Sequence, residues 1–185
     1  MKTFLSFLFL PCLLFADIVL LFPLKPSRES SFKIPIPPTF QEIWKTPNGK
    51  MVEYIPQNET LEAWNEIITV EVIPHQTGML DFYLRKHKIA IDMLFSASEI
   101  FRSEVAFTEE KGTKVGYAHY RNPHYLVETQ AVDNNFTESM GMKVVQGKND
   151  LFRVAYNIKY PEDASPLPFE EKIQSFLESC EVISP

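Results

Sequence analysis

The chain has 185 residues, of which 45% are hydrophobic and 23% charged, a composition typical of one globular domain with a short additional segment. Its formal net charge of -6 disfavours nucleic-acid binding, because a surface that follows phosphates needs clustered Lys and Arg. Neither G-x-G-x-x-G nor G-x-x-x-x-G-K-[ST] occurs, so no nucleotide-binding loop is predicted.

The first 24 residues have the pattern of an export signal. Lys2 precedes an almost uninterrupted apolar run over residues 3–24, which is typical of a leader and not of a folded domain. Cleavage after Ala16 is one interpretation, although Leu14 is bulky for a position three residues before the cut. The run is also long enough to span a bilayer, so residues 1–24 are either a signal peptide or a membrane anchor. The protein is therefore expected to be exported, periplasmic or secreted, with an inner-membrane anchor as the alternative.

Residues 25–38, rich in Pro and Ser, predict an extended linker, and residues 39–185 a single domain without internal repeats. If the leader is removed, Cys180 is the one remaining thiol, and no internal disulfide can form. Cys180 lies on the apolar side of the last predicted helix, so we expect a buried cysteine that acts as a small hydrophobic residue.

The first part of the domain predicts strands around a turn. Pro47, Asn48 and Gly49 suit a tight hairpin turn between strands near residues 43–46 and 50–55. Leu61 and Trp64 recur at helical spacing and predict a helical turn over the sheet. Alternation over residues 67–73 then predicts a strand.

The longest helical pattern covers residues 78–101. Its apolar stripe consists of Leu80, Leu84, Ile91, Leu94, Phe95 and Phe101. The basic cluster at residues 85–88 could bind an anion, but a solvated helix face is the ordinary interpretation, with His87 half-buried near the stripe.

Hairpins dominate the next part of the chain. Strands are predicted at residues 104–110 and 114–120 around a Lys111-Gly112 turn, at residues 125–132, and at residues 142–147 and 151–160. A helix over residues 168–180 ends the chain, with Phe169, Ile173 and Phe176 on its buried side. The predicted class is α+β, an antiparallel sheet of about six strands with the middle and C-terminal helices packed on one face.

The sequence contains no pattern that indicates a catalytic or cofactor-binding residue. His119, His124 and Glu128 place two imidazoles and a carboxylate around a predicted turn, which is the best set of metal ligands in the chain. However, neither H-E-x-x-H nor C-x-x-C occurs, and histidines on the exposed side of a hairpin are common. No Ser lies in a G-x-S-x-G elbow.

Tyrosines offer a second kind of site, a ligand pocket or a peripheral binding surface. Five of them lie on neighbouring predicted strands: Tyr117, Tyr120, Tyr125, Tyr156 and Tyr160. The alternative for most of them is a place in the hydrophobic core with the hydroxyl at a wet end.

The order of elements resembles the small α+β domain of the PsbP, Mog1 and DcrB group, and the stretch "EYIPQNETLEAWNEIITV" is similar to a segment of uncharacterised exported bacterial proteins. The resemblance covers about residues 52–180 and rests on layout, since it includes no diagnostic motif. It implies a non-enzymatic accessory or binding role, without cofactor and without catalytic residues to transfer.

Three functional hypotheses follow. The first is an exported binding or accessory protein whose partner is another protein or an envelope component, with no nucleic acid bound. The second is a secreted effector that acts on a host protein. The third is an exported metal-dependent hydrolase that uses His119, His124 and Glu128.

Overall fold

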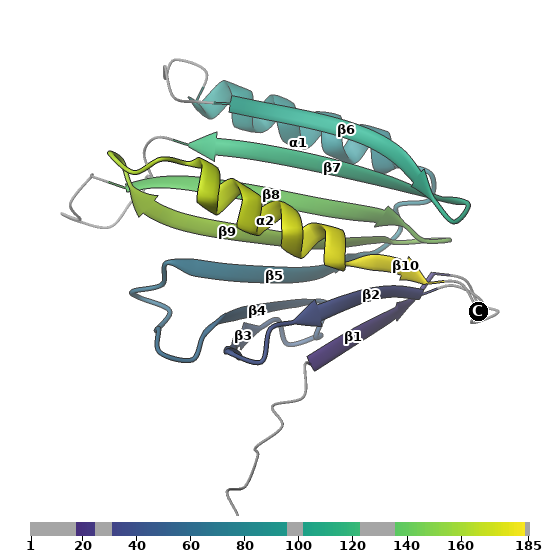
Figure 1. The fold of residues 1–185 in the computed structure, drawn as a ribbon. Helices are drawn as coiled ribbons and strands as arrows, with labels where there is room; N and C mark the ends of the chain where they lie inside the picture. Colours follow the sequence, from purple (N-terminus) through teal and green to yellow (C-terminus); the bar gives the residue numbers. More distant parts are fainter. Residues whose placement is uncertain (1–17, 25–30, 96–101, 123–135, 184–185) are drawn as a thin grey trace, which may run out of the picture.

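The computed structural model describes residues 18–24, 31–95, 102–122 and 136–183, and its largest element is a seven-stranded antiparallel sheet (Figure 1). The strand order is β3-β4-β5-β9-β8-β7-β6. The strands are β3 (Phe40–Lys45), β4 (Met51–Pro56), β5 (Glu66–Ile73), β6 (Arg102–Glu110), β7 (Thr113–Asn122), β8 (Phe136–Gln146) and β9 (Leu151–Pro161). The predicted α+β class is confirmed.

Sequential hairpins connect most of these strands, as the turn residues predict. Gly49 between β3 and β4 has a φ of 66°, a left-handed value that glycine adopts at little cost. Gly112 between β6 and β7 has a φ of 75°, and the full register runs from Arg102 opposite Arg121 to Glu110 opposite Thr113. The strand predicted at residues 125–132 lies outside the described residues.

A second, three-stranded sheet contains a segment that the composition assigned to the linker. Its strands are β1 (Ile18–Pro23), β2 (Ser31–Ile36) and β10 (Glu181–Ile183), in the order β1-β2-β10. Phe32, Ile34 and Ile36 are completely buried, so residues 31–36 belong to the folded unit and do not form a linker. Their alternation with polar residues and Pro35 is the period of a half-buried strand, which the Pro and Ser content obscured. β10 pairs with residues 31–33 of β2, so Pro35 lies where β2 has a partner on one side.

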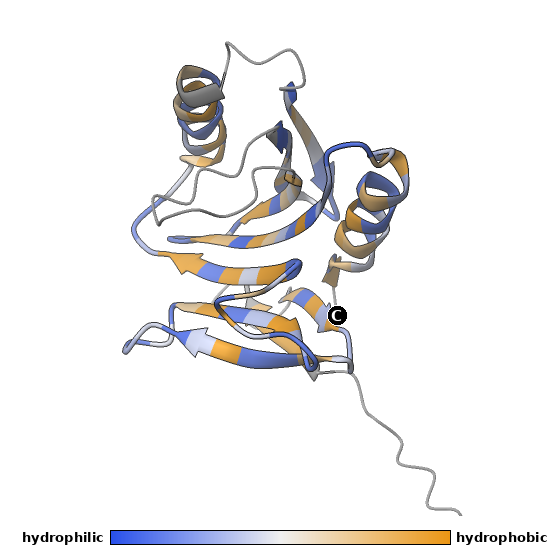
Figure 2. Cartoon of the chain, turned by 90° about the vertical axis from the view of Figure 1, so that its left-hand side faces the viewer, coloured by the Kyte–Doolittle hydropathy of each residue, from blue (hydrophilic) through white to orange (hydrophobic). Residues whose placement is uncertain are grey.

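The helices α1 (Leu80–Phe95) and α2 (Leu167–Ser179) lie on opposite faces of the large sheet (Figure 2). A Cβ atom on Gly116 of β7 would meet Leu84 of α1, whereas one on Gly141 of β8 would meet Ile173 of α2. Gly141 is opposite His119, three residues from Gly116, so the two glycines face opposite sides of the pleated sheet. The predicted placement of both helices on one face therefore needs correction. An amphipathic stripe shows that a helix covers a sheet, but not which side it covers.

Two hydrophobic clusters correspond to these two faces. The larger lies between the sheet, α2 and the three-stranded sheet, and includes Phe32, Ile34, Tyr54, Val154, Tyr156 and Phe176. The smaller lies beneath α1 and includes Leu80, Leu84, Ala118, Tyr120, Met142 and Ala155. α2 packs on β8 and β9, and the small sheet shares its cluster with β3, β4 and β5.

The turn between β4 and β5 differs from the predicted helical packing. Residues 57–65 form turns, Leu61 is 44% exposed, and the Trp64 ring lies 3.5 Å from the Lys159 ammonium group. Trp64 therefore makes a cation–π contact with β9 in place of a helical contact with the core.

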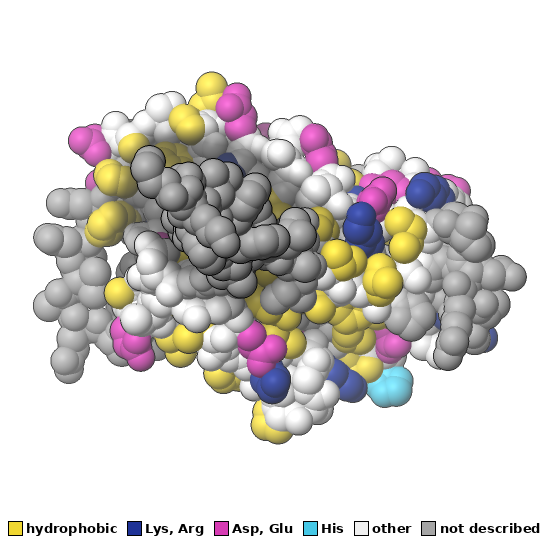
Figure 3. Space-filling model, turned by 60° about the horizontal axis from the view of Figure 1, so that its bottom comes forward, with side chains coloured by type: hydrophobic (Ala, Val, Ile, Leu, Met, Phe, Trp, Pro, Cys, Tyr) yellow, Lys and Arg dark blue, Asp and Glu magenta, His cyan; other side chains and the backbone are white. Residues whose placement is uncertain are grey.

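The end of the molecule formed by β1, β3 and β4 has a mixed surface. Val19, Leu21 and Trp44 are exposed there, and Figure 3 shows hydrophobic side chains among polar and charged ones on this face. Within the described residues, neither helix has the length and hydrophobicity that crossing a bilayer would require.

Phe32 tests the place of β2 in the fold. Phe32→Ala should lower the free energy of unfolding by about 3–5 kcal/mol, because it leaves a cavity in the larger cluster. Urea unfolding followed by fluorescence measures this change. Lys33→Ala, which removes an exposed ion pair with Glu181, is the control and should cost at most about 1 kcal/mol. If both substitutions change the free energy of unfolding by the same small amount, residues 31–36 are not part of the core and the linker interpretation holds.

Cys180 is completely buried, as predicted, and burial raises the pKa of its thiol to about 12. In a Cys12→Ser background we expect no alkylation of the folded protein by iodoacetamide at pH 8, since the thiolate is the nucleophile. Rapid alkylation should appear after unfolding in urea. Mass spectrometry of the two samples makes the comparison, and modification of the native protein would contradict a buried thiol.

Candidate functional site

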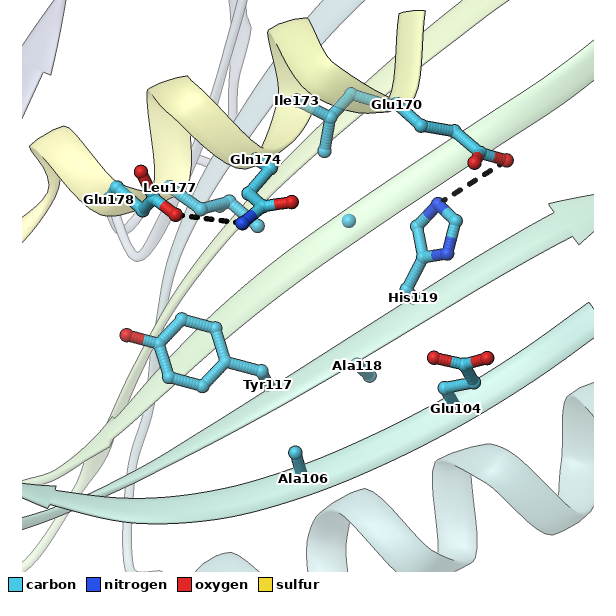
Figure 4. A pocket seen from close by; sticks show the side chains of 11 residues that line it. Glu104, Ala106, Tyr117, Ala118, His119, Glu170, Ile173, Gln174, Leu177 and Glu178 are labelled. Atoms are coloured by element: carbon cyan, nitrogen blue, oxygen red, sulfur yellow. Dashed lines mark hydrogen bonds and ion pairs between the residues drawn. The ribbon is translucent and has the colours of Figure 1, made fainter. Parts of the chain in front are cut away.

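A groove of about 450 Å³ lies between α2 and the neighbouring strands β6, β7 and β8 (Figure 4). Its lining combines an apolar floor with acidic, amide and imidazole side chains. The lining residues are Glu104, Ala106, Tyr117, Ala118, His119, Gly141, Glu170, Ile173, Gln174, Leu177 and Glu178. Its volume is in the range of small-molecule and cofactor sites.

The groove exists because α2 covers a part of the sheet. α2 packs on β8 and β9, so the same face of β6 and β7 remains uncovered beside it. Gly141 lets α2 approach closely, since a Cβ atom there would be 2.3 Å from Ile173 Cγ2 and 2.9 Å from Leu177 Cδ1. Ala106 on β6 is exposed and short, which keeps the side of the groove opposite α2 open.

His119 on β7 and Glu170 on α2 face each other across one end of the groove (Figure 4). Their closest atoms, Nε2 and Oε1, are 4.0 Å apart, which is too far for a hydrogen bond. Arg121 Nη1 forms an ion pair with the same Glu170 oxygen at 3.4 Å. Both Nε2 of His119 and Oε1 of Glu170 are buried atoms without a hydrogen-bond partner within the described residues.

The pKa of His119 lies below its usual value. Burial of the ring is the largest cause, and the carboxylates of Glu170 and Glu104 act in the opposite direction. Arg121 and Arg102 lower the pKa further. At neutral pH the ring is therefore uncharged, and one of its nitrogens is a hydrogen-bond acceptor.

A buried network fixes Tyr117 at the other end of the groove. The Tyr117 hydroxyl donates to Glu110, whose carboxylate also forms an ion pair with Lys143 Nζ at 2.9 Å. Lys143 in turn donates to the backbone carbonyl of Cys180, just after α2. Burial and the hydrogen bond to Glu110 raise the pKa of Tyr117, so its hydroxyl stays protonated. The ring is therefore a fixed wall and not a nucleophile.

Carboxylates lie on both sides of the groove. Glu104 comes from β6, and Glu170 and Glu178 come from α2, where Gln174 Nε2 donates to Glu178 at 2.8 Å. Among the described residues that line the groove, no Lys, Arg, Ser, Thr or Cys occurs. The arrangement can accept hydrogen bonds and attract positive charge. An imidazole beside a carboxylate could also act as a general base, but the usual Ser or Cys nucleophile does not line the groove with it.

The structure tests the metal candidates in part. His119 lies in the groove, whereas His124 and Glu128 lie outside the described residues. The described residues contain no group of three His, Cys, Asp or Glu side chains that could hold a metal ion. A metal site at His119, His124 and Glu128 therefore stays a prediction.

Of the five candidate tyrosines, Tyr117 lines the groove. Tyr120 packs under α1, where its hydroxyl is 3.1 Å from His87 Nδ1, and Tyr156 and Tyr160 are buried in the larger cluster. Tyr125 lies outside the described residues.

Sequence reasoning did not find the acidic groove residues. By sequence, Glu170 falls in the helix predicted over residues 168–180 and Glu104 in the strand predicted over residues 104–110, and neither position indicates a groove. Alternation along β6 and β7 could have placed Glu104 opposite His119, because that pair follows from the register of the hairpin.

The chain is similar to known proteins in its fold. No family model matches the chain, and no curated protein matches its sequence. The Saccharomyces cerevisiae Ran-binding protein Mog1p has a similar structure, with a TM-score of 0.52 and 13% identity over 91% of this chain and 96% of Mog1p. This likeness confirms the predicted Mog1-like fold.

Two further solved structures are more distant. LpqN of Mycobacterium tuberculosis, described as involved in cell envelope biogenesis, has a TM-score of 0.43 and 11% identity over 84% of each chain. A structure from Bacteroides thetaiotaomicron has a TM-score of 0.44 and 7% identity over 88% of this chain. This chain spans about half of the Bacteroides chain, 47% of its length.

Glu170→Gln tests the electrostatics of the groove. Because the Glu170 carboxylate raises the pKa of His119, its removal should lower that pKa further below the usual value. NMR titration of the imidazole signals measures the shift. Glu171→Gln changes the charge of the next residue, which lies outside the groove lining, and should leave the His119 pKa nearly unchanged. A rise in the pKa of His119 in Glu170→Gln would contradict the described geometry.

Proposed function

We propose that this protein is an exported, non-enzymatic binding or accessory protein whose partner enters the groove between α2 and β6–β8. The single observation that carries the proposal is the groove itself, an open cavity of about 450 Å³ beside a helix that is fixed from several sides. Its polar groups can receive a ligand, because two buried polar atoms there, Nε2 of His119 and Oε1 of Glu170, have no hydrogen-bond partner within the described residues.

The firm attachment of α2 supports a preformed binding site. Lys172 donates to both oxygens of Glu66 on β5, at 2.6 and 2.8 Å. Phe169 stacks on Tyr160 of β9, with ring centroids 4.4 Å apart. A wall held in this way loses little conformational freedom on binding, which favours affinity.

The position of β1 supports export with a cleaved leader. Ile18, the first residue of β1, is the second residue after the cleavage predicted behind Ala16, and β1 pairs with β2 over its full length. A helical anchor over residues 1–24 would have to withdraw these residues from the small sheet. The apolar run that precedes β1 is shorter than the roughly 20 residues a membrane-spanning helix needs, and it fits the apolar segment of a signal peptide.

A protein is the kind of partner that we propose. Mog1p, which shares the fold, is a Ran-binding protein, so this fold serves protein binding in that case. The groove is open along β6, where Glu104 and Ala106 are exposed, and a protruding side chain of a partner could enter it from there.

A photo-crosslinking residue in the groove tests this function. In the native host, p-benzoylphenylalanine at Gln174 should form a defined protein adduct on irradiation, detected by a shift on an immunoblot. Fractionation of the same cells should place the adduct in the envelope or the medium, which separates an envelope partner from a secreted role.

The matched control is the same residue at Ser175, which is exposed on α2 but does not line the groove. It should form the adduct weakly or not at all. An adduct of equal strength at both positions, no adduct at either, or a purely cytoplasmic protein with its leader intact would contradict the proposal.

A further inference from the structure

We propose that the groove accepts a ligand that carries an ammonium or guanidinium group on an apolar stem. This inference rests on the proposed binding role of the groove and adds the chemical class of what enters it. The cation would be either a Lys or Arg side chain of a partner protein or a small free amine.

The charge of the lining selects a cation. Three carboxylates, on Glu104, Glu170 and Glu178, line the groove, and no Lys or Arg is among the lining residues that the structure describes. Arg121 offsets the charge of Glu170 from beside the groove. Glu178 receives a hydrogen bond from the neutral Gln174, which leaves its charge in place. The electrostatic potential in the groove is therefore negative, and the low dielectric constant of the protein walls increases its magnitude.

The two buried acceptors point to a ligand with N–H donors. His119 Nε2 and Glu170 Oε1 lie 4.0 Å apart, and neither has a hydrogen-bond partner in the described part of the chain. Glu170 Oε1 is an acceptor, and Nε2 of the neutral imidazole is also an acceptor in the tautomer that has its proton on Nδ1. An ammonium or guanidinium group has several N–H donors and no acceptor, and can donate to both atoms at once.

The floor of the groove suits an alkyl stem. Ala106, Ile173 and Leu177 are apolar, and Ile173 and Leu177 pack over Gly141, which has no side chain. Tyr117 offers an aromatic ring at one end, and its hydroxyl is already engaged with Glu110. The Lys143 ammonium already lies over this ring, 5.3 Å from its centroid, so the ring serves here to pack against methylene groups. The cationic group of the ligand would thus lie near the carboxylates, and its apolar stem would lie on the apolar floor.

The test uses the purified protein without its leader and three probes of equal length. Hexylamine is cationic, hexan-1-ol is neutral and hexanoate is anionic. NMR titration should give saturable shifts of the His119 and Tyr117 signals with hexylamine, and a dissociation constant about tenfold or more below those of the other two probes. Higher salt should weaken the binding of hexylamine, because salt screens exposed charges.

Two variants assign the binding to the groove. The double substitution Glu104→Gln and Glu178→Gln should weaken hexylamine binding about tenfold or more. Glu109→Gln removes one carboxylate from the opposite face of β6, outside the groove, and should bind hexylamine as the parent does. Ala106→Trp fills the groove from an exposed position and should abolish binding without touching the core, even if the double variant does not fold.

A tripeptide with a central lysine, blocked at both ends, distinguishes the sources of the cation. Tighter binding of this peptide than of hexylamine, lost when norleucine replaces lysine, indicates a side chain of a partner protein. Tighter binding of hexylamine indicates a free amine. The proposal is overturned if hexanoate or hexanol binds as tightly as the cations, or if no cation shifts the His119 signals. A groove adduct at residue 174 together with absent cation binding would leave the binding role intact and refute the ligand class.

Discussion

The close contact between α2 and β8 at Gly141 is the constraint on which the site depends. Because Gly141 has no side chain, Ile173 and Leu177 rest directly on the strand, closer than a Cβ atom would permit. This depth brings the polar residues of α2 level with those of β7, so that Glu170 can face His119. A side chain at Gly141 would lift the helix and widen the groove. The packing of the core and the geometry of the site are therefore set at the same residue.

A buried lysine fixes the other end of α2. The Lys143 side chain is 2% exposed and is satisfied by Glu110 and by the carbonyl of Cys180. Burial acts against ionisation of Glu110, but the hydrogen bonds from Tyr117 and Lys143 hold the pKa of its carboxyl below its usual value. Lys143 is buried and Glu110 only partly so; the pair adds little net stability compared with apolar residues, but loss of Glu110 would leave a buried ammonium group without its counter-ion. Its role here is positional, since one network fixes the Tyr117 ring and the end of α2 together.

The sequence predicts well what depends on local pattern. Alternation in β9 and β5, the Lys111-Gly112 turn and the apolar side of α2 all indicate the observed elements, and Cys180 is buried as its place in the pattern suggests. Each of these features depends on a short run of neighbouring residues. The α+β class follows from their order along the chain.

Features that depend on long-range pairing could not be predicted in this way. Residues 31–36 look like a linker by composition, and their strand character requires β1 and β10 as partners from opposite ends of the chain. The apolar stripe of a helix does not specify which face of the sheet the helix covers, so the placement of α1 and α2 on opposite faces could not be predicted. Glu104 and Glu170 are 66 positions apart in the numbering, and nothing local connects them. Of the polar groove residues, the sequence indicates only His119, as a metal ligand, and Tyr117, as part of a ligand pocket, because the residue type of each suggests a site without reference to its neighbours.

The alternation of β7 explains how an open groove can still be rigid. Ala118 and Tyr120 point into the cluster beneath α1, whereas Tyr117 and His119 point into the groove on the other face. Each groove residue is therefore flanked along the strand by a residue locked in the core. The backbone that positions His119 cannot shift without disturbing the packing of α1, although the groove side of the strand has no helix over it. The packing of α1 on one face of β7 thus makes the strand rigid. The groove face can therefore present polar side chains to a ligand at fixed positions.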